Sequence, residues 1–455
     1  MDVEEWTDLG RRGLLSEKDV AAQLEVNTYG KPLNTLQNCV LIFSYDPMLA
    51  GAISFNLLDE RQYVTKPLGW TRHRGPAVED DDFDRIRLYI ENTYGISSIK
   101  NLRTAMNITA KDRSYHPVRD LLNELEWDGA ERVRHALHHF LGAEEDDYTY
   151  EVLKLTMQGI IHRVFNPGTK FDYMLCLIGE QGCGKSTFFR FLAMRDEWFT
   201  DDLRDLESEK VWQKMRGHII NELSEMLAAN NAKTSEAVKA FISRQKETYR
   251  LPYDIYSTDH PRQCIFVGTT NKVRFLPNDR TGNRRFLPVM CNPKNAEVFI
   301  LDDEVSSRAY IMQMWAEMME VYRSEKPLLK LPQDISKVLP DIQKVFQQED
   351  SDAGMILEFM LSTDKDRVCS RMIFKEALKN ENINPARWQT NEICEIMNQL
   401  IATGELKGWR AYDSPKRFQF YGTQKGWERI PVLPLGQQGE KRFAEVADEA
   451  DLPFK

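Results

Sequence analysis

The residues from Gly179 to Ser186 have the types and spacing of a phosphate-binding loop. They fit the pattern G-x-x-x-x-G-K-[ST] and stand between an apolar run of strand length and a helical pattern, as this motif requires. Glycines let several backbone N–H groups face one anion, and the helix N-terminus adds positive partial charge. We therefore expect ATP and Mg²⁺ to bind at this loop, with Lys185 on the β- and γ-phosphates and Ser186 on the metal. The expected nucleotide-binding residues are Gly179, Glu180, Gln181, Gly182, Cys183, Gly184, Lys185, Ser186 and Thr187.

A second acidic group must complete such a site, and the segment Gly217–Glu225 offers one. A short apolar strand around Ile219 and Ile220 runs into carboxylates about 35 residues after the loop. Glu222 is the first candidate for the acid that holds the metal or activates water, and Glu225 is the second. The alternative is that these glutamates begin a surface helix.

Two further segments have side chains suited to phosphoryl transfer. The apolar run Phe266–Val267 ends in Gly-Thr-Thr-Asn, so Asn271 is expected near the γ-phosphate, where an amide can orient the attacking water. Arg284 and Arg285 follow a Gly-Asn turn and suit an arginine finger, which a neighbouring subunit can supply. Of the two, Arg284 is the preferred candidate, and a structural salt bridge is the alternative role for at least one of them.

These groups require a sheet to position them. Continuous apolar runs at Tyr173–Ile178, Ile219–Ile220, Cys264–Val267 and Phe286–Met290, separated by helical patterns, predict a mainly parallel α/β core that is covered on both faces. Three helices are predicted before this core, over Val118–Leu125, Ala130–Leu141 and Tyr148–Val164.

Beyond the core the pattern predicts a winged helix. Helices are expected over Ala353–Leu361, Ser370–Asn380 and Thr390–Thr403, followed by a hairpin of Leu406–Ala411 with Phe418–Gly422. The expected organisation is an accessory region at 1–115, a helical collar-like region at 116–170, the nucleotide-binding core at 171–330, the winged-helix-like domain at 345–430 and a flexible acidic tail at 431–455.

Composition excludes several classes of protein. The 455 residues are 42% hydrophobic and 29% charged, and seven scattered cysteines form no CxxC pair, which argues against a disulfide framework or a zinc site. The N-terminus does not read as a signal peptide and no apolar run is long enough for a membrane span, so a cytoplasmic location is expected. With a net charge of −10, any nucleic acid must meet a local basic surface.

Seven segments in one order resemble the virulence-associated protein E family of phage and mobile-element replication proteins. They are Leu177–Phe188, Glu222–Glu225, Lys239–Ser243, Tyr249–Tyr253, His260–Cys264, Thr269–Asn271 and Thr281–Phe286. The similarity extends over about residues 95–330 and includes Trp127-Asp128-Gly129. Proteins of this family look like superfamily 3 helicases of the AAA+ class.

The resemblance implies an ATP-driven DNA motor, usually a ring-shaped homo-hexamer in a bacterial host cytoplasm, with ATP at subunit interfaces. Single-stranded or forked DNA is the implied partner. Family members often carry a primase domain, but residues 1–115 are too short for one and lack a convincing pair of catalytic aspartates. Priming is therefore expected from a separate primase or initiator.

DNA contacts are expected in two places. The segment 233–262 mixes basic and aromatic residues, which can contact phosphates and stack on bases, and in ring helicases of this type it forms a hairpin facing the pore. Its candidates are Lys239, Lys246 and Arg250, and a solvated amphipathic helix with packed aromatics is the alternative. In the winged-helix-like domain, Lys416 and Arg417 are best placed for phosphates, although this domain also suits protein docking.

Two alternatives to a helicase remain at this stage. One is an origin-binding initiator or loader that uses ATP as a switch without processive unwinding. The other is a small-molecule kinase, which the paired arginines and the winged helix disfavour.

Overall fold

The computed structural model describes residues 15–203, 206, 208, 211–223, 232–250, 256–276, 283–325, 328–347, 351–380 and 384–430. The chain divides into two compact units, Met1–Gln347 and Gln348–Lys455. Within the described residues, no helix has both the length and the apolarity that crossing a bilayer demands.

The first part of the larger unit has its own hydrophobic core. Residues from Leu15 to Ala110 form one buried cluster around a three-stranded sheet in the order β2-β1-β3. The acidic run at 79–84 begins a helix here, and Asp82 caps its first turn by accepting a hydrogen bond from the backbone amide of Glu79 at 3.0 Å. The elements are α2 (Glu17–Ala22), α3 (Leu36–Tyr45), β1 (Ile53–Asn56), β2 (Arg61–Val64), α4 (Asp80–Tyr94), α5 (Ile99–Asp112) and β3 (Ser114–Tyr115).

A five-stranded parallel sheet follows, with the strand order β10-β4-β9-β6-β5. Its strands and preceding helices are α6 (Pro117–Glu124), α7 (Val133–Leu141), α8 (Asp147–Phe165), β4 (Met174–Ile178), β5 (Phe199–Thr200), β6 (Ile220–Glu222), β9 (Ile265–Thr270) and β10 (Phe286–Met290). The remaining elements are α9 (Lys185–Leu192), η1 (Asp196–Trp198), α10 (Val211–Met215), α12 (Ala232–Ile242), β7 (Lys246–Tyr249), β8 (Thr258–Pro261), α13 (Glu304–Glu325) and α14 (Gln333–Val345). The prediction of a mixed α/β core with a parallel sheet is confirmed.

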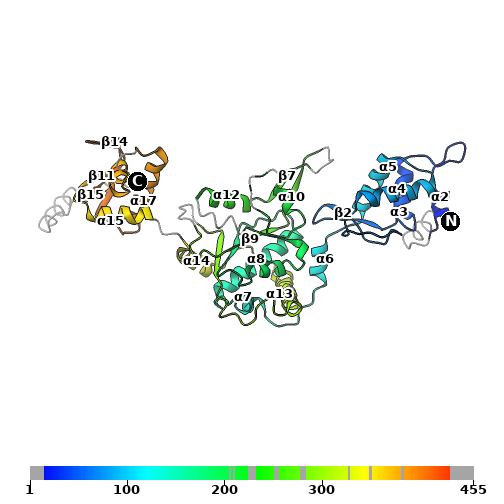
Figure 1. The fold of residues 1–455 in the computed structure, drawn as a ribbon, viewed down its shortest axis with the longest axis horizontal. Coiled ribbons are helices and arrows are strands. Elements are labelled where there is room, and N and C mark those ends of the chain that lie inside the picture. The colour runs from blue at the N-terminus through cyan, green and yellow to red at the C-terminus, as the bar shows by residue number, and fades with distance from the viewer. Residues whose placement is uncertain are drawn as a thin grey trace, which may run out of the picture. The chain divides into compact units, whose positions relative to one another are not determined.

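Both faces of this sheet are covered. Along β4, Leu175 and Leu177 join one buried cluster, whereas Met174, Cys176 and Ile178 join another. Helices α7, α8 and α13 lie on one side of the sheet and α10 and α12 on the other (Figure 1). Burial on both faces explains the continuous apolar runs in the sequence, because a strand covered on both sides has no polar face.

The helices at 116–170, which the sequence predicts as a collar-like region, pack against the parallel sheet. Buried residues of α6, α7 and α8, such as Val118, Phe140 and Ile160, share one hydrophobic cluster with the sheet residues Leu175 and Val267. These helices therefore form one covering layer of the parallel sheet.

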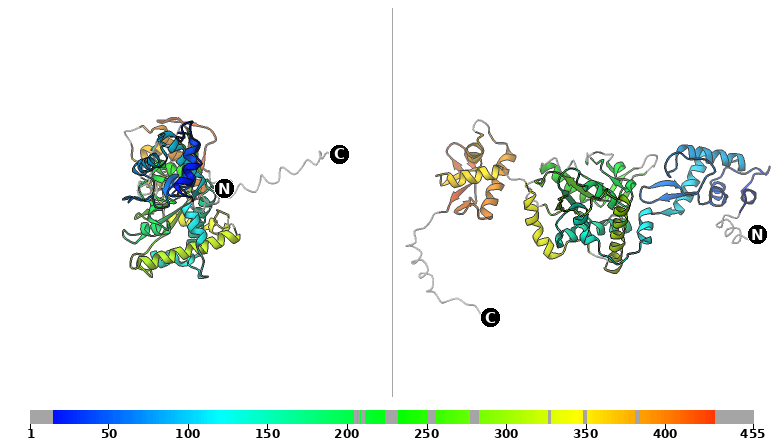
Figure 2. Two further views of the ribbon diagram at one scale, coloured as in Figure 1. Left: turned by 90° about the vertical axis from the view of Figure 1, so that its right-hand side faces the viewer. Right: turned by 60° about the horizontal axis from the view of Figure 1, so that its bottom comes forward.

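The second unit combines helices with an antiparallel sheet (Figure 2). Its elements are α15 (Ser351–Ser362), β11 (Arg367–Cys369), α16 (Ser370–Met372), η2 (Ile373–Ala377), α17 (Arg387–Ala402), β12 (Trp409–Ala411), β13 (Lys416–Phe418), β14 (Gly422–Gln424) and β15 (Gly426–Arg429). Strand β15 lies between β11 and β12, and β13 pairs with β14.

The strand pairing predicted for the hairpin of this unit is wrong. Strand β12 pairs with β15, and residues 419–421 form the turn of a separate hairpin between β13 and β14. Trp427 in β15 is buried in the core of the unit, which fixes β15 in the centre of the sheet.

Candidate active site

The phosphate-binding loop joins β4 to α9 at the carboxyl edge of the parallel sheet. Gly182 and Gly184 have φ angles of 82° and 90°, which residues with a Cβ atom rarely adopt. At Gly179 a Cβ atom would lie 2.7 Å from the carbonyl oxygen of Cys291. The glycines are thus required by the backbone path, and that path suits a cradle of N–H groups around an anion.

Lys185 lies inside this loop and is only 7% exposed. Its Nζ donates hydrogen bonds to the carbonyl oxygens of Gly179 and Glu180 at 2.8 and 2.7 Å. It also donates to Oδ1 of Asn271 at 3.2 Å. A buried positive charge therefore stands at the centre of the loop, where phosphate oxygens would replace neutral carbonyl partners.

Glu222 ends β6 and is 1% exposed. Its Oε1 accepts hydrogen bonds from Ser186 Oγ at 2.8 Å and from Thr269 Oγ1. Its Oε2 is buried and finds no hydrogen-bond partner among the described residues. Burial raises the pKa of Glu222, and the hydrogen bonds from Thr269 and Ser186 oppose that shift.

The pairing of Ser186 with Glu222 fits a magnesium ion. Mg²⁺ prefers oxygen ligands, and a hydroxyl beside a carboxylate with one unpartnered oxygen supplies them. Metal binding would also compensate the negative charge that burial disfavours. Both residues that the sequence assigned to the metal are therefore brought together.

Asn271 reaches the site because β9 lies between β4 and β6 in the sheet. The loop follows the end of β4, Asn271 follows the end of β9, and Glu222 ends β6, so all three meet at the same edge. Sequence reasoning assigned no role to Thr269, which holds the carboxylate of Glu222. Thr269 meets Glu222 through the pairing of β9 with β6, which no local pattern in the sequence indicates. Glu225 lies outside the described residues.

Arg284 and Arg285 lie at the opposite edge of the sheet. They precede β10, whose first residue pairs with Met174 at the start of β4, whereas the loop follows the end of β4. A strand of five residues spans about 17 Å, so the sheet itself separates both arginines from the loop of their own chain. Arg285 donates to Ser243 Oγ at 3.0 Å and lies 3.3 Å from a carboxylate oxygen of Asp172, whereas Arg284 is exposed.

The segment expected to face DNA contains an antiparallel hairpin of β7 and β8, in which Thr248 pairs with Asp259. Three of its basic residues are exposed: Arg244, Lys246 and Arg250. Lys246 forms an ion pair with Asp259, and both side chains remain about half exposed at 59% and 48%. Tyr256 near the tip is 77% exposed. These residues can meet a nucleic acid strand.

Other members of this segment are structural. Lys239 is 5% exposed with its ammonium 5.8 Å from the centre of the Phe286 ring, so a DNA strand cannot reach it in this conformation. Arg262 is 3% exposed, pairs with Glu247 and donates to the carbonyl oxygen of Phe241 at 2.6 Å. The expectation of a DNA contact at Lys239 is therefore not supported.

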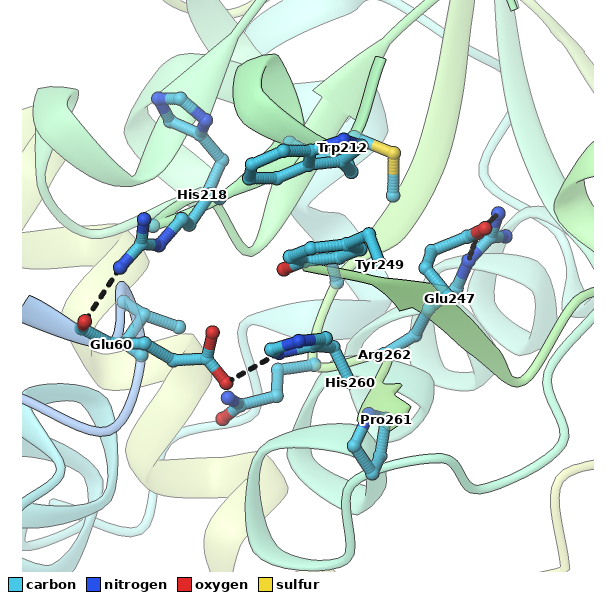
Figure 3. A pocket seen from close by; sticks show the side chains of 14 residues that line it. Glu60, Trp212, His218, Glu247, Tyr249, His260, Pro261 and Arg262 are labelled. Carbon is cyan, nitrogen blue, oxygen red and sulfur yellow. Dashed lines mark hydrogen bonds and ion pairs between the residues drawn. The ribbon is translucent and has the colours of Figure 1, made fainter. Parts of the chain in front are cut away.

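Three stacked rings include one residue from each strand of the hairpin, Tyr249 of β7 and His260 of β8. Tyr249 lies between Trp212 and His260, with ring centroids at 3.9 and 3.8 Å and interplanar angles of 13° and 6° (Figure 3). The rings line a small pocket together with Glu60 and Arg216. Both faces of the Tyr249 ring are thus covered by its neighbours. This ring is therefore not available to stack on bases, although the sequence suggested that aromatic residues of this segment could do so.

Glu60 ties the N-terminal region to this hairpin. Its carboxylate lies 2.9 Å from Nδ1 of His260, and its carbonyl oxygen accepts a hydrogen bond from Arg216 at 2.6 Å (Figure 3). Nearby, Gln263 donates to the carbonyl oxygen of Leu57 at 2.8 Å. The accessory region is therefore a support for the hairpin.

In the second unit, the predicted DNA contacts Lys416 and Arg417 lie on β13. Lys416 is 3.9 Å from Glu428, with 47% of its side chain exposed, and its ammonium lies 4.0 Å from the centre of the Tyr412 ring. Arg417 is exposed, and no acidic residue in the described part of the chain pairs with it. Arg417 is thus the freer of the two charges.

Three solved structures are similar over 83% of this chain and 96% of theirs: the apo structure of NrS-1 C terminal region (305-718), with 12% identity and a TM-score of 0.43, the A form apo structure of the same region, with 12% and 0.41, and the A form apo structure of NrS-1 C terminal region-CTR, with 11% and 0.44. No curated protein matches the chain.

A family model described as the Virulence-associated protein E-like domain matches residues 122–348. This range contains the phosphate-binding loop, Glu222, Asn271, both arginines and the hairpin. The chain is therefore a member of the virulence-associated protein E family, through a domain that carries the whole candidate site.

Proposed function

We propose that this protein is an ATP-dependent DNA helicase that serves the replication of a phage or mobile element. The observation that carries the proposal is the meeting of four groups at one sheet edge: Lys185 with Asn271, and Ser186 with Glu222. Each is a residue type that nucleotide hydrolysis on a phosphate-binding loop requires. The family resemblance adds DNA as the substrate of the motor.

Each group has a distinct task in this proposal. The loop amides and Lys185 bind the phosphates, and Ser186 with Glu222 would hold Mg²⁺, which neutralises charge on the β- and γ-phosphates. Asn271 orients the attacking water through its side-chain amide. Glu222 holds the metal or accepts the proton of that water, and Thr269 fixes its carboxylate for either task.

The arginines support a site shared between subunits. Since the sheet separates Arg284 from the loop of its own chain, any contact with the γ-phosphate must come from a neighbouring copy. A head-to-tail ring, the hexamer that the resemblance implies, provides such a contact at every interface. The exposed cations of the β7–β8 hairpin, Lys246 and Arg250, would then follow one DNA strand.

Mixing two inactive variants tests this arrangement. We expect Arg284→Ala and Lys185→Met each to lose hydrolysis, and an equal mixture to regain up to about a quarter of wild-type activity, because one interface in four pairs an intact loop with an intact arginine. Steady-state ATP hydrolysis after subunit exchange is the measurement. Arg285→Ala is the matched control and should keep hydrolysis, because Arg285 pairs with Asp172 in a partly buried contact in which 24% and 17% of the two side chains are exposed. A mixture that stays inactive would show that Arg284 does not act across the interface.

A second candidate function is an origin-binding initiator or loader that uses ATP as a switch. The element order of the second unit supports it: α15, β11, the contiguous segments α16 and η2, α17, then β12, the β13–β14 hairpin and β15, an order compatible with the winged helix that the sequence predicts. Sequence-specific binding of duplex DNA without strand separation would favour this function over the helicase.

A further inference from the structure

The hairpin of β13 and β14 carries a single aromatic ring that points away from the protein. Phe418 pairs with Gly422, so residues 419–421 form a three-residue turn, and Gly422 has the φ of 74° that such a turn favours at this position. Phe420 stands at the middle of the turn and is 89% exposed. We refer to residues 416–424 as the wing.

The two aromatic side chains nearest to Phe420 in the sequence face the interior of the unit. Phe418 and Tyr421 pack against the hydrophobic core of the second unit. The hydroxyl of Tyr421 also donates to Oε1 of Glu376 at 3.1 Å. These two anchors fix the turn, and the fixed turn holds the Phe420 ring in solvent.

Basic residues outnumber acidic ones in the segment that carries this ring. Residues 410–429 contain five Lys and Arg against two Asp and Glu, in a chain whose net charge is −10. Arg417 is exposed on the wing and Lys425 directly after it, and the backbone amide of Arg371, whose side chain is also exposed, donates to Oε1 of Gln424 at 3.2 Å. An apolar ring among cations matches an unpaired base with its phosphates better than it matches an apolar protein surface.

We propose that the wing is a base-stacking site for the junction between single-stranded and duplex DNA. Phe420 stacks on the first unpaired base, and Arg417 and Lys416 contact the adjacent backbone phosphates. The interior of a duplex offers no exposed base face, so the site favours a fork over continuous duplex. The proposal rests on the proposed action on DNA, but it does not need ATP hydrolysis.

Fluorescence of 2-aminopurine at the first unpaired position of a forked duplex tests this site in the full-length protein without nucleotide. Wild type should quench the probe. Phe420→Ala should lose the quenching and weaken fork binding by about 5- to 150-fold. Phe420→Tyr keeps an aromatic face and should bind like wild type, whereas Phe420→Leu keeps only the apolar surface and should behave like the alanine variant.

Three results would overturn the site. Undiminished quenching by Phe420→Ala would show that the ring does not meet the base. Equal binding by the leucine and tyrosine variants would indicate an apolar docking surface without stacking. Absence of fork binding by wild type would contradict the proposed action on DNA as well, which separates failure of this site from failure of the function.

Discussion

Replacing Lys185 with methionine should lower the rate of ATP hydrolysis by about 10²–10³-fold, because it removes a preorganised charge from the phosphates. Methionine is the suitable substitution, since Lys185 is 7% exposed and its aliphatic stem fills the loop. The carbonyl oxygens of Gly179 and Glu180 lose a donor in the variant, so the empty loop should also become less stable. Steady-state hydrolysis and nucleotide affinity are the two measurements.

Cys183→Ala is the matched control for Lys185→Met. Its sulfur lies 3.4 Å from the lysine Nζ and is equally buried, but the loop uses the backbone at this position. We expect this variant to keep hydrolysis within a fewfold of wild type. If the methionine variant hydrolysed ATP within tenfold of wild type, or if both variants lost it equally, the charge of Lys185 would not be the cause.

Glu222→Gln should abolish hydrolysis while leaving nucleotide binding nearly intact. Loss of a carboxylate that activates water costs about 10²–10⁴-fold, and the glutamine Oε1 can still accept the hydrogen bonds from Ser186 and Thr269. Nucleotide affinity from a titration with a fluorescent analogue, beside the hydrolysis rate, separates the two effects. Glu225→Gln is the parallel variant, because the sequence offers Glu225 as the alternative acid. Loss of hydrolysis in that variant alone would move the assignment to Glu225.

Glu222→Gln should also stabilise the nucleotide-free protein against unfolding at neutral pH. Burial raises the pKa of Glu222 above its value in the unfolded chain, so folding favours the protonated form. That contribution is complete below the unfolded pKa and is lost as pH rises through the folded pKa. Glutamine stays neutral, and the melting temperature of Glu222→Gln should therefore exceed that of wild type at pH 8 by more than at pH 5. If the difference in melting temperature between Glu222→Gln and wild type were the same at pH 5 and pH 8, the carboxylate of Glu222 would not become ionised while buried.

The parts of the candidate nucleotide site were predictable because they are local. The loop motif fixes its own backbone, and Glu222 and Asn271 each follow an apolar run that ends at the same sheet edge. Thr269 required the register of β9 beside β6, which no local pattern gives. The position of the arginines across the sheet required the pairing of β10 with β4.

The DNA-facing residues were less predictable because their burial depends on distant partners. Lys239 looks like a solvated cation in the sequence, but it is covered by a contact with Phe286. Glu60 and His260 are 200 residues apart and meet only in the folded chain. In the second unit, the periodicity of apolar residues predicted the helices. The partner of β12 could not be predicted in this way, because it is the later strand β15, whose Trp427 is buried in the core.

Strand displacement on a forked duplex, with ATP and Mg²⁺, tests the central claim most directly. We expect wild type to separate the strands and Lys185→Met to bind the fork without separating it, because the hydrolysis site drives the motor. If wild type hydrolysed ATP in a DNA-stimulated manner but never displaced a strand, the helicase proposal would be contradicted and the initiator or loader would take its place.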